Sequence, residues 1–236
     1  MADPLRVLTY NILNENQGEG AFDRRFGTIA ALVLDLKPDV VCLQEAPDTA
    51  SVRRLVAMMV ERQQRAMFVA LTKMEQADGW QEYLAIIHPG TRAVATRQTA
   101  PSGERVAVSL KLAASNISVT TTHLNPFSSE ARHAQAASIL ASLPDDGPAM
   151  LCGDLNAAPT GETLKLLQTK LEVLAPNLAG PPTFATGLRK EPASVILDYI
   201  LGRGLKAVDA GLVGDRQVNG IWPSDHIGVW ADVVPA

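Results

Sequence analysis

The sequence predicts a single α/β domain in which β-sheets are covered by helices. Short apolar runs typical of strands alternate with longer segments of helical periodicity along the whole chain. The chain has 236 residues, of which 47% are hydrophobic and 19% are charged, so it can bury a sizeable core. No proline-, glycine- and serine-rich linker and no internal repeat divides it. We therefore expect one domain over residues 1–236.

Strands and helices alternate in the first part of the chain. Strands are expected at 5–10 and 39–43, and the second is a continuous apolar run of the kind found in sheets covered on both faces. A helix is expected at 22–36, where apolar side chains recur every three or four residues, and another at 51–61. Arg24 and Arg25 fall on the first helix, and we expect both to be solvated.

The rest of the chain begins with a different pattern. From residue 84 to residue 124 short strands follow one another and predict antiparallel pairing. Helix and strand patterns then return up to the C-terminus. The expected elements are strands at 105–110 and 117–122, a helix at 129–143, and strands at 149–152, 195–201, 207–213 and 227–233. The segment 176–192 is expected to be a surface loop, in which Arg189 and Lys190 could flank a site.

Composition excludes several functional classes. Lys and Arg number 21 and Asp and Glu 25, and the net charge of -4 disfavours a protein that holds nucleic acid mainly by cationic charge. Cys42 and Cys152 lie in apolar runs, so we expect buried, reduced thiols. No apolar run approaches the roughly 20 residues that cross a bilayer. Because the N-terminus lacks signal-peptide features, a cytoplasmic location is expected.

Polar residues end several of the predicted strands. Asn11, Glu45 and Asp154 each follow an apolar run, Asn156 comes two residues after Asp154, and His123 ends a further strand. Any one of these alone is more often a turn residue or a satisfied strand-end histidine. Ligand sites in covered sheets, however, gather outside the carboxyl ends of strands. These side chains are therefore candidates for one shared crevice.

Two further segments carry acids in informative places. Asp198 lies inside the apolar run 196–200, where a carboxylate is costly to bury unless it is paired or bound to a metal. Asp225 and His226 directly precede the last predicted strand and would, taken alone, be an ordinary loop pair.

In this order, these segments resemble the endonuclease/exonuclease/phosphatase superfamily, which includes pancreatic-type DNases, repair nucleases, bacterial sphingomyelinases, inositol-polyphosphate 5-phosphatases and deadenylases. The most specific pieces are Gly153-Asp154-Leu155-Asn156 and Ser224-Asp225-His226, and the resemblance extends over nearly the whole chain. It implies a four-layer αββα sandwich, in which two mixed β-sheets pack face to face with helices outside.

The resemblance also implies roles for the matching residues. Glu45 would ligate an essential divalent metal, with Asn11 beside it and Asp225 in the same set. Asp225 would also hold the tautomer of His226, which would face the scissile phosphate. Asp154 would orient or deprotonate the attacking water.

Three more residues complete the implied catalytic set. Asn156 would hold a phosphoryl oxygen, Asp198 would support the centre, and His123 would help to bind phosphate. His123 stands where repair nucleases of the exonuclease III type usually carry tyrosine. Many members also place a Gly-Asn pair before the strand that here begins near Glu82, and this chain lacks that pair.

The residue types favour Mg²⁺ or Mn²⁺ as the cofactor. Carboxylate oxygens are hard ligands that suit these ions better than Zn²⁺. The four histidines show no His-Glu-x-x-His spacing, and the cysteines are not paired in the sequence, so the zinc signatures are missing.

Three residues are candidates for substrate contact. Arg132 and Gln135 lie three positions apart on one face of the expected helix, where they could reach a substrate phosphate or pair structurally. Trp222 is a candidate for the rim of the site, although core packing would explain it equally well. The aromatic content of 5% is too low to predict a base-stacking platform.

The leading hypothesis is therefore a metal-dependent phosphodiesterase. It would hydrolyse phosphate esters by in-line attack of water, without a covalent enzyme intermediate, most often as an endonuclease or exonuclease on DNA or RNA. A phosphodiesterase or phosphatase acting on small molecules or phospholipid head groups is the alternative. A catalytically silent binding module is the third hypothesis. We expect a monomer with no obligate protein partner.

Overall fold

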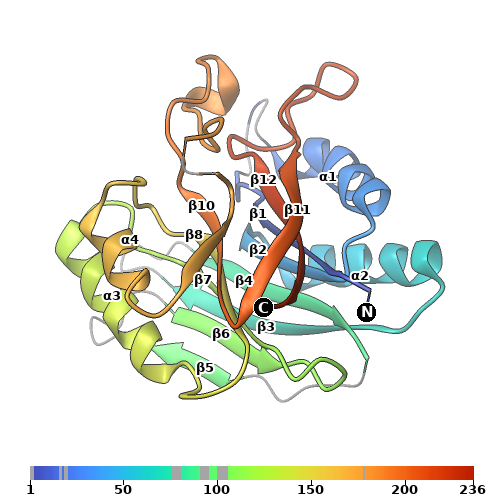
Figure 1. Cartoon of the computed structure of the whole chain (residues 1–236). Helices are drawn as coiled ribbons and strands as arrows, with labels where there is room; N and C mark the ends of the chain where they lie inside the picture. Colours follow the sequence, from blue (N-terminus) through green and yellow to red (C-terminus); the bar gives the residue numbers. More distant parts are fainter. Residues whose placement is uncertain are drawn as a thin grey trace.

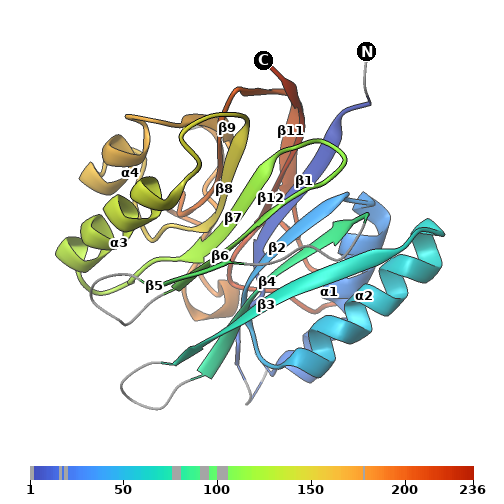
Figure 2. The ribbon, with the colours of Figure 1, turned by 90° about the horizontal axis from the view of Figure 1, so that it is seen from below.

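The structure is a computed structural model that describes residues 3–15, 18, 21–75, 81–90, 96–99, 106–177 and 179–236. Two six-stranded mixed β-sheets pack face to face, and helices cover the outer face of each (Figure 1 and Figure 2). This arrangement confirms the expected four-layer αββα sandwich. Within the described residues, no helix combines the length and the apolar character that a membrane span requires.

The first sheet combines strands from both ends of the chain in the order β11-β12-β1-β2-β4-β3. Its central strands β1 and β2 are parallel, and the other neighbours are antiparallel. Its strands are β1 (Leu5–Asn11), β2 (Val40–Ala46), β3 (Met67–Glu75), β4 (Gln81–Pro89), β11 (Leu205–Val213) and β12 (Gly228–Pro235), and its helices are α1 (Phe22–Leu36) and α2 (Thr49–Gln63).

The second sheet is built from the middle of the chain in the order β5-β6-β7-β8-β10-β9. Here β7 and β8 form the parallel pair. Its strands are β5 (Thr96–Thr99), β6 (Val106–Lys111), β7 (Ser118–His123), β8 (Ala149–Asp154), β9 (Glu172–Ala175) and β10 (Asp198–Arg203), and its helices are α3 (Ser129–Ser142) and α4 (Glu162–Leu167).

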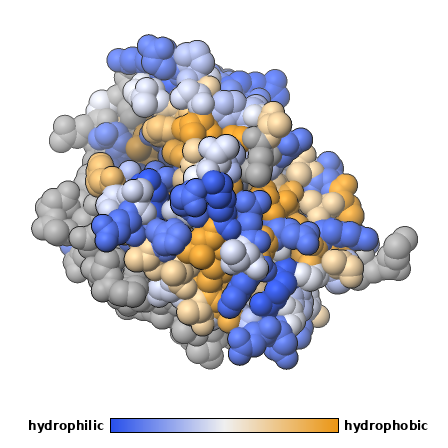
Figure 3. Space-filling view, turned by 60° about the vertical axis from the view of Figure 1, so that its left-hand side comes forward, coloured by the Kyte–Doolittle hydropathy of each residue, from blue (hydrophilic) through white to orange (hydrophobic). Residues whose placement is uncertain are grey.

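An apolar core fills the space between the sheets because alternate residues of the strands point inward. It includes Val7 and Cys42 from the first sheet and Val119, Met150 and Cys152 from the second. Both cysteines are buried and free, as expected. On the face shown in Figure 3, apolar areas are broken up by hydrophilic side chains, which is ordinary for a protein surface.

Most elements expected from the sequence are present, with shifted ends. The strand expected at 195–201 is β10, which begins only at Asp198. Val195 pairs with Phe184 in a separate bridge, and residues 183–185 also hydrogen-bond to the loop before β12. Helix α4 was not expected, since six residues are too few for a periodic signal. The segment 176–192, in its described residues, is a loop with one 3₁₀ turn (Gly187–Arg189). Residue 105 of the expected strand 105–110 lies outside the described residues.

The topology brings several strand ends to one edge of the sandwich. In the first parallel pair, β1 ends at Asn11 and β2 carries Glu45 next to its last residue. In the second parallel pair, β7 ends at His123 and β8 ends at Asp154. Strand β10 is antiparallel to β8, so its first residue, Asp198, lies opposite Asp154. The predicted crevice is therefore a direct consequence of strand direction.

Gly153 permits the close contact between β7 and β8 at this edge. Its φ is +147°, and a Cβ at this position would lie 2.0 Å from the carbonyl oxygen of Thr122. The contacted oxygen belongs to the backbone of Thr122, so no side-chain rotation can relieve the clash. Glycine is therefore required for the register that places His123 opposite Asp154.

We predict that Gly153→Ala lowers the free energy of unfolding by about 1–3 kcal/mol, as overpacking does in other proteins. Gly27 in α1 is the matched control, because no atom beyond its chain neighbours and the backbone of its own helix lies within 4 Å of a Cβ built there. Gly27→Ala should raise the free energy of unfolding by about 0.5–1 kcal/mol through helix propensity. Urea denaturation measures both variants, and equal effects of the same sign would contradict the prediction.

Candidate active site

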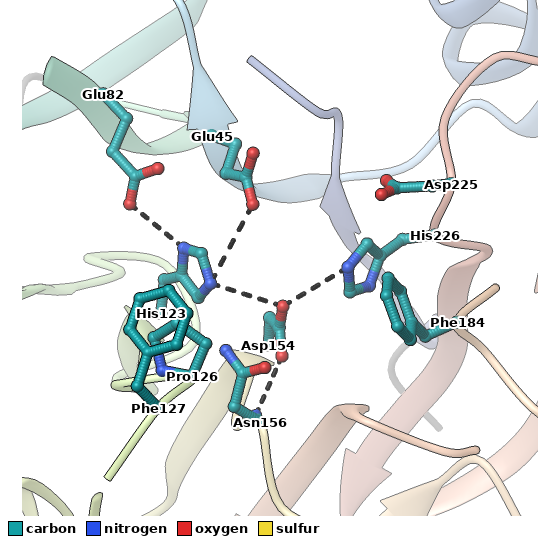
Figure 4. A pocket seen from close by; sticks show the side chains of 10 residues that line it. All are labelled: Glu45, Glu82, His123, Pro126, Phe127, Asp154, Asn156, Phe184, Asp225 and His226. Atoms are coloured by element: carbon teal, nitrogen blue, oxygen red, sulfur yellow. Dashed lines mark hydrogen bonds and ion pairs between the residues drawn. The ribbon is translucent and has the colours of Figure 1, made fainter. Parts of the chain in front are cut away.

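A pocket of about 260 Å³ opens at this edge, between the two sheets (Figure 4). Its lining combines carboxylates, imidazoles and two aromatic rings, and consists of Glu45, Glu82, His123, Pro126, Phe127, Asp154, Asn156, Phe184, Asp225 and His226. The structure thus brings together most of the residues expected from the sequence. Glu82, Pro126, Phe127 and Phe184 were not expected.

Asp154 occupies the centre of the pocket, between the rings of His123 and His226 (Figure 4). Its Oδ2 lies 3.4 Å from Nε2 of His123 and 3.5 Å from Nε2 of His226. The same oxygen accepts a hydrogen bond from Nδ2 of Asn11 at 3.1 Å, and Oδ1 accepts one from the backbone N–H of Asn156 at 2.8 Å. The carboxylate is therefore fixed from both sheets.

Asp198, rather than Asp225, orients the imidazole of His226. Nδ1 of His226 lies 2.9 Å from Oδ2 of Asp198, whose carboxylate is fully buried. The expectation that Asp225 holds the tautomer is therefore wrong. Asp225 and His226 are neighbours in the segment before β12, but their side chains have different partners: His226 binds Asp198, while the Asp225 carboxylate is 3.3 Å from Oγ of Ser224.

The charges around His226 favour its protonated form. Burial alone would lower the pKa of His226, but the negative charges of Asp198 and Asp154 outweigh burial and raise the pKa to about 10. Burial raises the pKa of Asp198, and the charge of His226 opposes this shift. We therefore assign an imidazolium bound to a carboxylate, whose Nε2–H faces Asp154.

A second histidine–carboxylate pair lies on the other side of Asp154. Nδ1 of His123 lies 3.0 Å from Oε1 of Glu82, which is 1% exposed on β4. Because β4 is antiparallel to β2, the start of β4 lies beside the end of β2 that carries Glu45. The available sequence signal was an acid at the start of the apolar run 82–87, the same kind of signal that singled out Asp198.

Glu45 projects into the pocket from an irregular strand end. Its φ of +53° is in the left-handed region, and the pairing of β2 with β4 shifts register between Leu43 and Ala46. Its carboxylate accepts hydrogen bonds from Nδ2 of Asn11 at 2.9 Å and from the backbone N–H of Asn14 at 3.1 Å. Left-handed backbone in a non-glycine residue costs about 1–3 kcal/mol and clusters at functional sites.

Asn11 fits an orienting role better than a metal-ligating one. Its amide nitrogen points at the carboxylates of Glu45 and Asp154, while its amide oxygen accepts a hydrogen bond from the backbone of Leu13. A metal ligand would have to offer the oxygen instead. The expected metal role of Asn11 is therefore not supported by its geometry.

The carboxylates fit a divalent cation. Two groups each have ligand atoms within 4.8 Å of one another: Glu45, Glu82 and His123 form one, and Asp154, Asp198 and His226 form the other. In the first group the side chain of Glu45 is 19% exposed, compared with 1% for Glu82 and 5% for His123. Its oxygens suit Mg²⁺ or Mn²⁺, which keep water and substrate oxygens as further ligands. Among the described residues, Asp225 lines the pocket but belongs to neither group.

The three expected substrate contacts do not line the pocket. Arg132 donates to the backbone oxygens of Asn125 and Pro126 at 2.9 and 3.2 Å. Gln135 is 1% exposed and accepts from the backbone N–H of Asn125. Both side chains thus hold the loop that follows β7. Trp222 packs against the guanidinium of Arg189, whose central carbon lies 4.8 Å from the centroid of the Trp222 ring. It does not line the pocket.

These features agree with the comparison to known families. The sequence model of the endonuclease/exonuclease/phosphatase family matches residues 8–226, so the chain belongs to this family. The family consists of phosphoester hydrolases. No protein of curated function matches the sequence significantly.

Solved structures share the fold at low sequence identity. The human Nocturnin catalytic domain has a TM-score of 0.70 and 23% identity, over 99% of this chain and 94% of that one. D. rerio TDP2 in complex with a single-strand DNA product has a TM-score of 0.74 and 18% identity, over 98% of each chain. A mannosyl-6-phosphatase from Bacteroides thetaiotaomicron has a TM-score of 0.72 and 18% identity, over 98% and 99%.

We predict that Mg²⁺ or Mn²⁺ raises the unfolding temperature through Glu45. A ligand present at 100 times its Kd stabilises the folded state by about 2.7 kcal/mol. Glu45→Gln should remove most of this shift. Glu162→Gln is the control, because Glu162 is an exposed acid paired with Lys165 on α4. Thermal unfolding with and without EDTA measures the effect, and an unchanged shift in Glu45→Gln would contradict it.

Proposed function

We propose that the protein is a divalent-metal-dependent phosphodiesterase that uses in-line attack of water, with nucleic acid as its leading substrate class. The observation that carries the proposal is the position of Asp154 between two imidazoles, each backed by a buried carboxylate. Phosphoryl transfer depends on positioning and on neutralising charge on the phosphoryl oxygens, and this arrangement supplies both.

In this mechanism Asp154 is the general base. Its Oδ1 is held by the backbone N–H of Asn156, and its Oδ2 faces the pocket between the histidines. It orients a water molecule and accepts a proton from it during attack on phosphorus. Positioned general acid–base catalysis typically contributes about 10²–10⁴-fold.

The two histidines bind the phosphate. Nε2–H of His226 donates to one phosphoryl oxygen, and Nε2 of His123 contacts another from the opposite wall. Asp198 and Glu82 hold the two rings through Nδ1, so each Nε2 is presented to the pocket in a fixed direction. Such donors stabilise the charge that develops on the phosphoryl group.

Glu45 would hold the divalent cation at the edge of the pocket. A bound Mg²⁺ or Mn²⁺ neutralises charge on the phosphoryl oxygens. Asn11 and the backbone N–H of Asn14 keep the Glu45 carboxylate turned toward the pocket.

The pocket favours a substrate that inserts one phosphate. Among the residues that the structure describes, its lining contains no lysine or arginine, and the net charge of the chain is -4. A long duplex, which is held through many phosphate contacts, fits this surface poorly. A single-stranded or terminal phosphodiester fits better. The small volume also supports the second candidate, a small phosphoester such as a sugar phosphate.

We predict that the protein cleaves bis-p-nitrophenyl phosphate in the presence of Mg²⁺ or Mn²⁺ and that EDTA abolishes this cleavage. Asp154→Asn and His226→Ala should each lower kcat by about a hundredfold or more. His133→Ala is the control, because His133 is exposed on α3 and outside the pocket. Full turnover in either site variant would contradict the assigned roles, and no turnover in the wild-type protein on any phosphoester would favour the silent-member hypothesis.

The substrate class requires a separate comparison. We predict a higher kcat/KM on single-stranded DNA or RNA than on duplex DNA, p-nitrophenyl phosphate or sphingomyelin. Binding to the single strand should weaken only moderately with salt, because few phosphates are contacted. A preference for p-nitrophenyl phosphate would instead identify a phosphomonoesterase.

A further inference from the structure

Two buried arginines, Arg25 and Arg189, bind backbone next to residues that line the pocket. Arg25 projects from α1 and is 0% exposed, although the sequence suggested a solvated position, and Arg189 lies in the 3₁₀ turn and is 9% exposed. A guanidinium is costly to bury unless its donors are satisfied. The groups that it binds therefore indicate its role.

Arg25 joins the segment after β1 to the loop before β12. Its Nη1 donates to the carbonyl oxygen of Ile12 at 2.8 Å and to that of Pro223 at 2.6 Å, and its Nη2 donates to the carbonyl oxygen of Leu13. The groups that hold the Glu45 carboxylate come from the last residue of β1, Asn11, and from Asn14 in the segment that follows. The guanidinium thus links the Glu45 side of the site to the start of the segment 223–226.

Arg189 binds the other end of that segment. Its Nη2 donates to the carbonyl oxygen of His226, and its Nη1 donates to the carbonyl oxygen of Gly214 at 2.6 Å. The guanidinium also lies 4.8 Å from the centroid of the Trp222 ring. Trp222, the aromatic residue expected at the rim, therefore supports this contact.

The backbone around Arg189 adopts an unfavourable conformation that brings the side chain inward. Leu188 and Arg189 have φ values of +44° and +60°, so two consecutive non-glycine residues are left-handed. Such residues persist only where surrounding contacts determine them. Here the surrounding contacts are those that the guanidinium makes with Gly214, Trp222 and His226.

We propose that Arg25 and Arg189 are positioning residues, which hold the backbone of residues 223–226 at both ends and thereby fix Nε2 of His226 opposite Asp154. The proposal rests on the proposed function, because His226 is assigned there to the phosphate. It also agrees with their absence from the pocket lining, since Nη1 and Nη2 of each guanidinium donate to backbone carbonyls.

The positive charges add an electrostatic contribution. Burial lowers the pKa of both guanidiniums, and the negative charge of Asp225 opposes this shift in each. The two cations therefore lie within electrostatic range of an acid that lines the pocket. They offset part of the negative charge of Asp225.

If Arg25 and Arg189 had a purely structural role, replacing either one would lower the stability of the fold without a specific effect on the reaction. Arg6 provides the matched control for this distinction. It makes two 2.7 Å hydrogen bonds to Asp232 and stacks 4.7 Å from the centroid of Trp230, so its removal also costs an ion pair and a ring contact. Arg6 lies near the start of β1, whereas the site lies at the end of β1.

The test compares Arg189→Met, Arg189→Lys and Arg6→Met. We expect Arg189→Met to lower kcat on bis-p-nitrophenyl phosphate about 10- to 100-fold with KM changed less than about threefold, since a misplacement of about 1 Å can cost a hundredfold. Arg189→Lys keeps one cationic contact and should recover part of kcat. Arg6→Met should lose unfolding temperature but keep kcat.

NMR of the four histidine side chains gives a readout that does not depend on activity. The His226 imidazole signal, assigned with His226→Gln, should shift or broaden in Arg189→Met and stay unchanged in Arg6→Met. If Arg189→Met does not fold, Arg189→Lys and Arg25→Lys carry the same comparison.

Two results would overturn the proposal. One is wild-type kcat together with an unchanged His226 signal in the Arg189 variants. The other is an equal loss of kcat in Arg6→Met, which would show a general effect of stability. If the wild-type protein hydrolyses no phosphoester, the proposed function fails, while the His226 signal still tests the positioning.

Discussion

The position of Asp154 between the two sheets is the constraint on which the rest of the site depends. Asp154 belongs to the second sheet, and Asn11 from the first sheet donates to it. A second polar tie lies nearby, where Nε2 of Gln44 on β2 donates to Oγ1 of Thr121 on β7 at 2.9 Å. The centre of the interface is apolar. The apolar core therefore brings the sheets together, and the polar ties fix their relative position at the proposed active site.

Burial and charge are balanced at this site by pairing acids with histidines. Asp198 and Glu82 are both buried, and a carboxylate in such a place is tolerated when it has a cationic or hydrogen-bonding partner. His226 and His123 provide these partners, and in return each ring is fixed in one orientation. Asp154 and Glu45 keep oxygens facing the pocket. The paired acids therefore hold the two imidazoles, while Asp154 and Glu45 are the acids that we propose to act on the substrate and the cation.

The sequence predicted the fold and much of the pocket because the informative residues follow strands. Asn11, Glu45 and Asp154 are found by reading along the chain and placing the strand ends at one edge. Partnerships between distant segments could not be predicted in this way. The pairing of Asp198 with His226 depends on β10 lying antiparallel to β8, and Glu82 reaches the site only because β4 pairs with β2. The burial of Arg25 likewise depends on carbonyl groups that no local pattern reveals.

The central claim is that Asp154 activates water for a single displacement at phosphorus. The most direct measurement is the stereochemical course of hydrolysis of a chiral phosphorothioate diester in ¹⁸O-labelled water. A single in-line attack inverts the configuration at phosphorus, and this is the result that the structure predicts. Retention of configuration would require two successive displacements through a covalent enzyme intermediate, and it would contradict the role assigned to Asp154.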